Sequence, residues 1–431
     1  MMKRSLCLLL LLALALILPG CGGGGGGGSA AGGYYSSYSP QASPTVTPTP
    51  PVWSGTSKFG CGGPESSDFQ SLVALGVHRK RVAISIFPSG SFTFDFLDSQ
   101  VTANQAYSIL TYFIIDPNRT GSTWVSSSTF SSALGTIVER YDGDGVNDMP
   151  GLLYPLQDFE ICNEIDTQST RWSGFTDAMY LDFMEKCFAA VKSASPGARL
   201  FAGALSQPPV GNNNKTFDRL VQNGGTPYFD AISYHDYQYL LEMDSLQAYL
   251  ASRNLLSKPV YITEADMSVE YNTSPQPTFT EQANMLIKSY AYALANSNIK
   301  TIIVTELQAL STQPAKLQWA ALLDLSGTKR PSFYACGKLI EKVDNFTESG
   351  LFSAGTGITC VRFVANNRTV YILWAAAAAQ AMIPTSAPRV RVTPVVPDGN
   401  GQFTSTEITA SAGYATVPAS STASYVEEVV P

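Results

Sequence analysis

The sequence predicts an α/β fold in which a (β/α)8 barrel, a TIM barrel, is followed by an all-β sandwich domain. Two observations support this. Over residues 56–343, eight apolar runs of strand length alternate with helical patterns. Such alternation implies a parallel sheet, and eight units imply a closed barrel. Over residues 344–431, short β-branched runs separated by turn residues imply a small accessory β-sandwich.

The strand candidates of the barrel are short apolar runs bounded by turn residues. They comprise residues 58–61, 80–86, 109–115, 159–162, 199–204, 231–234, 260–263 and 301–305. The third unit is the least regular, because several strand-like pieces crowd residues 92–101.

Helical patterns follow most of these strands, and the first one begins at a capping signature, Ser66-Ser67-Asp68. The helix candidates comprise residues 66–75, 130–141, 180–193, 217–222, 244–253, 281–295 and 332–343. In the C-terminal part, the strand candidates comprise residues 360–364, 369–373, 389–393 and 425–430.

The N-terminus has the features of a targeting segment. A basic start at Lys3 and Arg4 precedes an apolar run over residues 6–18, which is short for a membrane span and typical of a signal peptide. It ends at Leu18-Pro19-Gly20-Cys21, which resembles a bacterial lipobox and implies removal of residues 1–20 and lipidation of Cys21. Plain secretion is the alternative. A Gly-, Ser- and Pro-rich tether follows over residues 21–55. We therefore expect a lipid-anchored protein of the cell envelope, facing the periplasm or the exterior.

The composition excludes several classes. A net charge of −7 gives no attraction to nucleic acid. There is no Cys-x-x-Cys and there are only two histidines, so we expect neither a zinc site nor any other metal or cofactor. No Gly-x-Ser-x-Gly and no phosphate-binding loop occur.

Of the cysteines that follow Cys21, Cys336 and Cys360 flank the expected domain junction, and we expect them to form a disulfide.

Two strand candidates lead to a glutamate, at Glu164 and at Glu264. A carboxylate at the end of a buried strand is costly unless it is paired or used. The fourth and seventh strands of a barrel can aim side chains at one point above its C-terminal face. Val260, Ile262 and Glu264 share one side of their strand, so we expect two apolar layers below a carboxylate at the rim.

Three motifs stand at strand ends: Asn163-Glu164 on the fourth strand, His235-Asp236-Tyr237 after the sixth and Thr263-Glu264 on the seventh. Together they resemble the motifs of glycoside hydrolase clan A, the retaining (β/α)8 glycosidases, with families 39 and 5 as the expected nearest relatives. This resemblance implies a glycosidase that cleaves the O-glycosidic bonds of a poly- or oligosaccharide by double displacement.

The resemblance also implies roles for individual residues. Glu264 would be the nucleophile and Glu164 the acid/base, and Asn163 would hydrogen-bond the sugar 2-hydroxyl. His235 and Tyr237 match residues near the nucleophile and the sugar. Arg81 matches an arginine of the second strand that orients the nucleophile.

Three features depart from the family pattern or extend it. Ile165 replaces the usual proline after the Asn-Glu pair, and Val304-Thr305-Glu306 stands where a sugar-stacking tryptophan is usual. Trp172 could supply that stacking. Glu160 shares strand parity with Glu164, and an inward carboxylate there would need Arg79 or Arg81 as its cation.

Two alternatives to an active glycosidase stay open at this point. One is a non-catalytic, carbohydrate-binding surface lipoprotein with a decayed barrel, and the other is a structural surface protein that uses the barrel as a scaffold.

The acidic segment 142–148 resembles part of a calcium loop, although a tight turn is the expected interpretation.

Overall fold

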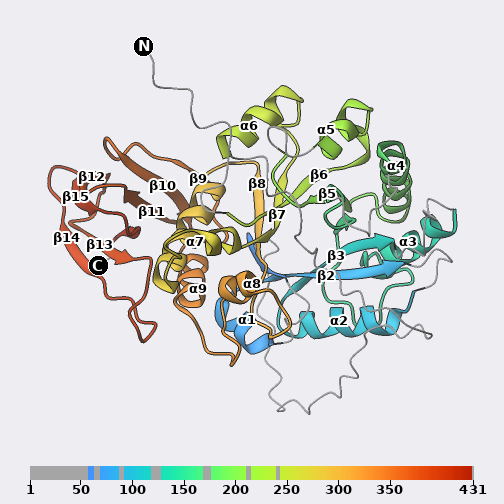
Figure 1. Ribbon diagram of the computed structural model, residues 1–431, viewed down its shortest axis with the longest axis horizontal. Coiled ribbons are helices and arrows are strands. Elements are labelled where there is room, and N and C mark those ends of the chain that lie inside the picture. Colours follow the sequence, from blue (N-terminus) through green and yellow to red (C-terminus); the bar gives the residue numbers. More distant parts are fainter. Residues whose placement is uncertain are drawn as a thin grey trace. The chain divides into compact units, whose positions relative to one another are not determined.

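A closed barrel of eight parallel strands forms the centre of the computed structural model, which describes residues 57–62, 68–86, 92–117, 128–167, 176–209, 215–238 and 243–429 (Figure 1). Neighbouring strands follow the chain order, and β8 closes the barrel on β1. The strands are β1 (Phe59–Cys61), β2 (Arg79–Ile86), β3 (Leu110–Pro117), β4 (Asp158–Ile161), β5 (Arg199–Leu205), β6 (Ala231–Asp236), β7 (Val260–Ala265) and β8 (Ile299–Val304). The predicted barrel is confirmed.

Helices surround the barrel and connect its strands (Figure 1). Asp68 caps the first of them, and its side chain accepts a hydrogen bond from the Ser71 amide, as the capping signature predicts. The helices are α1 (Phe69–Leu75), α2 (Phe94–Ala106), α3 (Ser128–Tyr141), α4 (Asp177–Ala194), α5 (Lys215–Gln222), α6 (Met243–Ser252), α7 (Phe279–Leu294), α8 (Ala315–Ala320) and α9 (Pro331–Val343), with short 3-10 turns at Thr226–Tyr228 and Ser268–Asn272.

The crowded segment near residue 94 is a helix and not a set of strands. Leu97, Val101 and Asn104 of α2 are buried at a spacing of four and three residues, which is the spacing of one helix face. Of the phenylalanines in the pattern that suggested strands, Phe96 is exposed, whereas Phe92 and Phe94 pack against the core. Helix α8 was not predicted either.

Additional antiparallel sheets follow the barrel. A six-stranded sheet has the order β14-β13-β16-β11-β10-β9, and β12 pairs with β15. Their strands are β9 (Glu348–Leu351), β10 (Ile358–Ala365), β11 (Arg368–Ala375), β12 (Ala379–Pro384), β13 (Arg389–Pro394), β14 (Thr406–Thr409), β15 (Tyr414–Ala419) and β16 (Ser424–Glu428).

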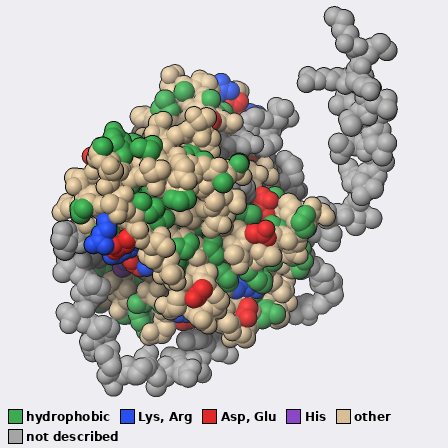
Figure 2. Space-filling view, turned by 90° about the vertical axis from the view of Figure 1, so that its left-hand side faces the viewer, with side chains coloured by type: hydrophobic (Ala, Val, Ile, Leu, Met, Phe, Trp, Pro, Cys, Tyr) green, Lys and Arg blue, Asp and Glu red, His purple; other side chains and the backbone are tan. Residues whose placement is uncertain are grey.

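Few charged side chains lie on the face shown in Figure 2, in keeping with the low overall content of charged residues, 14%.

The six-stranded sheet contacts the barrel helices directly. Val361, Phe363 and Tyr425 belong to the same buried cluster as the barrel core. Lys342 of α9 pairs with Glu427 of β16 at 2.5 Å, and both side chains are largely buried. These contacts join the sheet to the helical layer of the barrel.

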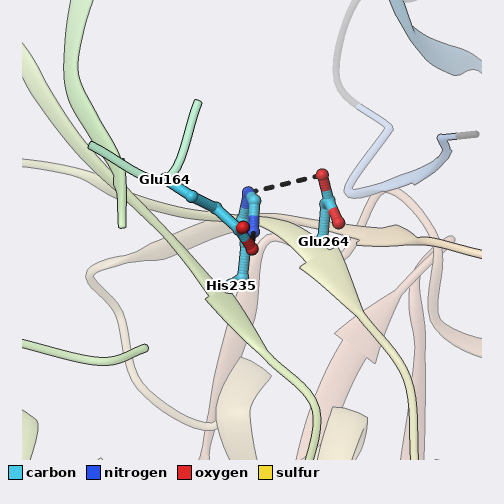
Figure 3. A group of neighbouring side chains, drawn as sticks. All are labelled: Glu164, His235 and Glu264. Carbon is cyan, nitrogen blue, oxygen red and sulfur yellow. Dashed lines mark hydrogen bonds and ion pairs between the residues drawn. The ribbon is translucent and has the colours of Figure 1, made fainter. Parts of the chain in front are cut away.

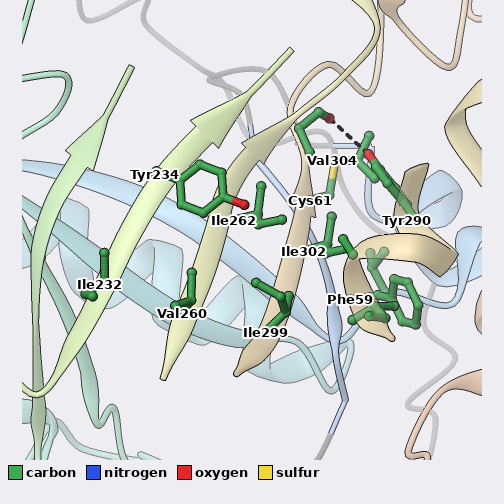
Figure 4. Close-up of a cluster of buried hydrophobic side chains, with 14 of the residues drawn as sticks. Phe59, Cys61, Ile232, Tyr234, Val260, Ile262, Tyr290, Ile299, Ile302 and Val304 are labelled. Carbon is green, nitrogen blue, oxygen red and sulfur yellow. Dashed lines mark hydrogen bonds between the residues drawn. The ribbon is translucent and has the colours of Figure 1, made fainter. Parts of the chain in front are cut away.

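The two sides of the barrel strands carry different residues. A buried cluster of Tyr112, Phe201, Ala231, Tyr261 and Ile303 comes from the strand positions that face inward. The alternate positions pack outward on the helices. The outward residues labelled in Figure 4 are Phe59, Cys61, Ile232, Tyr234, Val260, Ile262, Ile299, Ile302 and Val304, together with Tyr290 of α7.

The expected parity of β7 is therefore wrong. Val260 and Ile262 face the helices, whereas Tyr261 and Thr263 face the barrel interior. Pairing with β6 passes from Tyr234–Ile262 to His235–Glu264 and skips Thr263. Such a bulge re-aims the side chains that follow it. Glu264 consequently points into the mouth of the barrel. Val260 and Ile262, which lie on the same side as Glu264 in a regular alternation, do not.

The expected disulfide between Cys336 and Cys360 is also wrong. Both cysteines are buried and free, as are Cys61, Cys162 and Cys187. Cys336 packs in the barrel core, whereas Cys360 packs in a separate cluster among the C-terminal strands. Their separation into two cores removes the geometry that a disulfide requires.

None of the helices in the described part of the chain combines the length and the apolar character that crossing a membrane requires.

Candidate active site

Polar side chains from four barrel strands come together; those of β4, β6 and β7 come from the C-terminal ends of their strands, whereas Arg81 is the third residue of β2. Arg81 comes from β2, and Asn163 and Glu164 follow β4. His235 and Tyr237 come from the end of β6, and Glu264 from β7. This is the face at which (β/α)8 enzymes carry out chemistry.

The two predicted carboxylates are close to one another. One carboxylate oxygen of Glu164, one of Glu264 and one ring nitrogen of His235 all lie within 4.8 Å of each other. The Tyr237 hydroxyl lies 3.2 Å from Glu164 Oε1 and 2.7 Å from Glu264 Oε2. Two glutamates a hundred residues apart in the sequence thus share one hydroxyl partner.

His235 lies between the carboxylates and is fully buried (Figure 3). Its Nδ1 is 3.0 Å from Glu164 Oε1 and 2.8 Å from the Tyr237 hydroxyl, and its Nε2 is 3.5 Å from Arg81 Nη2. A proton on Nδ1 satisfies this pattern, because Nδ1 then donates while Nε2 faces an arginine N–H as an acceptor. We assign this tautomer from the hydrogen-bond partners. Tyr237 is then free to donate its proton to Glu264.

Arg81 contacts both ends of the site. Its Nη1 donates to Glu264 Oε1 at 2.5 Å, and its Nη2 donates to Asn163 Oδ1 at 2.7 Å. Its Nε donates to Glu160 Oε2 at 2.8 Å. Of the two cations considered for Glu160, Arg81 is therefore the partner, whereas Arg79 pairs with Asp158 at 3.1 Å.

The backbone leaves regular strand geometry where Glu164 is placed. β4 ends at Ile161, and the φ angles of Cys162 and Glu164 are +66° and +50°. Left-handed conformations of non-glycine residues cost about 1–3 kcal/mol each and cluster at functional sites. The Glu164 amide donates to the Ala204 carbonyl at 2.6 Å, which holds this turn against β5. Strand parity therefore does not extend from Glu160 to Glu164.

Charges at the site favour an ionised Glu264. Burial alone raises the pKa of Glu264, but the charge of Arg81 and hydrogen bonds from Tyr237 and Arg81 outweigh burial and hold that pKa below its usual range. Burial, together with the two nearby carboxylates, raises the pKa of Tyr237 far above its ordinary value. Tyr237 therefore remains a hydrogen-bond donor at neutral pH.

The remaining predicted site residues are placed differently or lie outside the described residues. Trp172 and Cys21 belong to the latter group. At the end of β8, Glu306 is buried and accepts a hydrogen bond from Gln313 Nε2 at 2.6 Å, so the described strand end carries no tryptophan. Trp319 of α8 is also buried, with its ring centroid 6.1 Å from that of Tyr271.

Three residues of this region have no role predicted from the sequence. Tyr112 and Thr263 donate to Glu160 at 3.1 and 2.8 Å from neighbouring inward positions. Asp266 follows Glu264 by two residues and is 2% exposed. Inward parity on β3 could have indicated Tyr112, whereas the bulge that turns Thr263 and Glu264 to the same side leaves no mark in the residue pattern.

Two groups among the described residues have the donor atoms of a metal site. Glu164, His235 and Glu264 form one, but Arg81 already occupies Glu264. Asp142, Asp144 and Asp148 form the other, in the turn between α3 and β4. Asp148 accepts hydrogen bonds from the Gly143 and Gly145 amides, as in a tight turn.

The barrel with two paired carboxylates at its C-terminal mouth defines a clan A glycoside hydrolase. The model of glycosyl hydrolase family 10 matches residues 121–338, more than half of the chain. The chain belongs to this family and is a glycosidase. The predicted clan is confirmed, although the matching family model is neither of the two families expected from the motifs.

Solved structures of glycosidases share the fold. A family 39 glycoside hydrolase from Bacteroides cellulosilyticus has a TM-score of 0.65 at 16% identity, over 86% of this chain and 81% of that one. A family 30 endoxylanase from Clostridium papyrosolvens has a TM-score of 0.59 at 17% identity, over 87% and 98%. A β-xylosidase from Caulobacter crescentus has 0.57 at 12% identity, over 87% and 97%. Among curated proteins, no match was found.

Asp266 provides a test of the electrostatics beside Glu264. Burial raises the pKa of Asp266 from 3.8 to about 6, and no described residue hydrogen-bonds its Oδ2. An acid with a raised folded-state pKa favours folding below its unfolded pKa, and this contribution is lost as pH rises through the folded value. Between pH 4 and about 6.5, Asp266 should thus reduce the free energy of unfolding by up to about 3 kcal/mol.

Asp266→Asn should remove this pH dependence. The asparagine retains an acceptor for the Ser268 amide, which donates to Asp266 Oδ1 at 2.7 Å. Urea unfolding at several pH values should show the variant gaining stability relative to wild type as pH rises from 4 to 6.5. A stability difference that is constant over this range would contradict the assignment.

Proposed function

We propose that the protein hydrolyses β-glycosidic bonds with retention of configuration, with Glu264 as nucleophile and Glu164 as acid/base. The observation that carries the proposal is the pair of carboxylates whose nearest oxygens lie within 4.8 Å of each other and share the Tyr237 hydroxyl. Retaining enzymes place their carboxyl groups about 5–5.5 Å apart, whereas inverting enzymes need about 6.5–9.5 Å to admit a water.

The reaction proceeds in two displacements. A Glu264 oxygen attacks the anomeric carbon, the bond to the leaving oxygen breaks, and Glu164 gives its proton to that oxygen. Glu164, now ionised, removes a proton from a water molecule. This water attacks the anomeric carbon of the glycosyl-enzyme and releases Glu264. Arg81 and Tyr237 keep Glu264 ionised and oriented before the first step.

Asn163 is proposed to bind the sugar 2-hydroxyl. Its Oδ1 accepts from Arg81, which fixes the orientation of the amide and directs its N–H group away from the guanidinium. A donor held in this way can strengthen its hydrogen bond in the transition state. His235 supports the arrangement through its contacts with Glu164 and Tyr237.

For the substrate class we propose β-linked xylosides. The support is that two of the structurally similar proteins are described as an endoxylanase and a β-xylosidase. Among aryl β-glycosides, the xyloside or xylobioside should have the highest kcat/KM, and xylan should release reducing ends. Faster turnover of another sugar in the same panel would refute this substrate class but not the mechanism.

We further propose that the C-terminal strands form a two-layer sandwich. Ala381, Ile383, Ala415 and Val417 of the two-stranded sheet share one buried cluster with residues of the six-stranded sheet. A crystal structure in which the two sheets do not face each other would contradict this.

Replacing the nucleophile should abolish turnover. Glu264→Ala should reduce kcat on an aryl β-xyloside by at least about 1000-fold, because the glycosyl-enzyme cannot form. In the wild type, a 2-deoxy-2-fluoro glycosyl fluoride should label Glu264, detected by peptide mass spectrometry. A label on any other residue, or wild-type turnover by the variant, would remove Glu264 from this role.

Replacing the acid/base should give a variant that responds to an added anion. Glu164→Ala should hydrolyse an aryl glycoside with a good leaving group slowly, because deglycosylation lacks its base. Azide attacks without base assistance, so it should raise kcat and yield a β-glycosyl azide, identified by NMR. The absence of this product in a folded variant would count against Glu164 as acid/base.

The N-terminal features support a lipid-anchored location in the cell envelope, which we propose from the sequence alone. Cys21→Ser should then move the protein from the membrane fraction to the soluble fraction and abolish labelling with a radioactive fatty acid. Unchanged fractionation and labelling would contradict the anchor.

A further inference from the structure

Glu160 is a fully buried carboxylate that the proposed chemistry does not use. It lies on β4, four residues before Glu164, and its exposure is 0%. Arg81, Tyr112 and Thr263 all donate to it, from the three strands β2, β3 and β7. Arg81 contributes two contacts, Nε at 2.8 Å and Nη2 at 2.7 Å from Oε2.

These contacts fix the orientation of Arg81. The guanidinium is planar and carries its five N–H groups in a rigid fork, so holding one part of the fork determines where the rest points. With Glu160 on Nε and Nη2, the remaining N–H groups reach Glu264 at 2.5 Å and Asn163 at 2.7 Å. Glu160 thus lies behind the arginine, and the two residues proposed to act on the sugar lie in front of it.

Stability alone does not account for this carboxylate. A buried ion pair is often no more stable than apolar residues of the same volume, because desolvation offsets the attraction. The inward layer below already contains such apolar and aromatic residues, Tyr112 and Phe201 among them. Without Glu160, however, the negative charge of Glu264 alone would face the whole positive charge of the Arg81 guanidinium.

We propose that Glu160 is a positioning residue for the glycosidase reaction, acting through Arg81 on the orientation and the nucleophilicity of Glu264. The proposal rests on the proposed role of Glu264. Glu160 shares the arginine charge, so that Glu264 is held in place without being so strongly paired that it attacks poorly. The carboxylate itself contacts Arg81, Tyr112 and Thr263, and it acts through the arginine.

The charge effect can be measured as a shift in the pH profile. Besides Arg81, the titratable groups near Glu264 are His235, Tyr237, Glu164 and Asp266. Glu160→Gln leaves all of them in place and retains an acceptor for Arg81, but it removes one negative charge. The acidic limb of kcat/KM should move down by about one pH unit, because Glu264 then faces an unshared cation. A loosened Arg81 should also lower kcat/KM by about 100-fold.

The matched control is Asp158→Asn. Asp158 is on the same strand, two residues earlier, is 2% exposed, and pairs with Arg79 and Arg199 instead of Arg81. Both variants remove a buried carboxylate charge from the barrel interior, and both should lose stability in urea. Only Glu160→Gln should move the acidic limb. An equal shift in both variants, or an unmoved limb in Glu160→Gln, would overturn the proposal.

Glu160→Asp tests the position of the carboxylate separately from its charge. It also serves as the test variant if Glu160→Gln does not fold. It keeps the charge but withdraws the carboxylate by one methylene, so kcat should fall while the acidic limb stays within about 0.3 pH units of wild type. Wild-type kcat in this variant would refute the positioning role. Labelling of Glu264 by the 2-fluoro glycoside in the wild type distinguishes a failure of the proposed function from a failure of the proposed role of Glu160. Without that label the proposed function fails, whereas with it only the role of Glu160 is in question.

Discussion

A guanidinium buried in the mouth of the barrel is the interaction on which the site depends. Arg81 is 8% exposed and contacts Glu160, Asn163 and Glu264, which come from β4 and β7. Nearby carboxylates outweigh the effect of burial and raise the pKa of Arg81, so it remains charged. A buried cation requires carboxylate partners, and this one gathers them from opposite sides of the barrel. The position of Glu264 is thereby tied to β4, the strand that leads to Glu164.

The site lies where the strands stop being regular. A bulge at Thr263 turns both Thr263 and Glu264 toward the interior, and left-handed residues at Cys162 and Glu164 direct the second carboxylate back over the mouth. Regular alternation would have placed one of each neighbouring pair among the helices. The layers of apolar side chains beneath and around the barrel hold these irregular ends in place.

The fold was largely predictable from the sequence, because the repeated strand-and-helix pattern extends over the whole barrel. Paired glutamates at two strand ends, with Arg81, His235 and Tyr237, indicated the residues that the structure brings together. The parity of β7 was not predictable, since Val260, Ile262 and Glu264 follow a strict alternation in the sequence and the bulge interrupts it only in space. Inward parity on β3 could have indicated Tyr112, but the sequence does not show that its hydroxyl donates to Glu160. For Cys336 and Cys360 the sequence suggested too much. Both lie near the domain junction, which suggested a disulfide, but they belong to two separate cores.

The class of the protein and its mechanism rest on different observations. Membership of glycosyl hydrolase family 10 establishes the class, and the similarity to solved structures of glycosidases establishes the fold. The close approach of Glu164 and Glu264 concerns the mechanism, because carboxyl separation distinguishes retention from inversion. NMR of the first product formed from an aryl β-xyloside, or from the best substrate found, measures this outcome directly. The account predicts the β-anomer as the initial product, with the α-anomer arising later by mutarotation. An α-anomer at the earliest time points would contradict it.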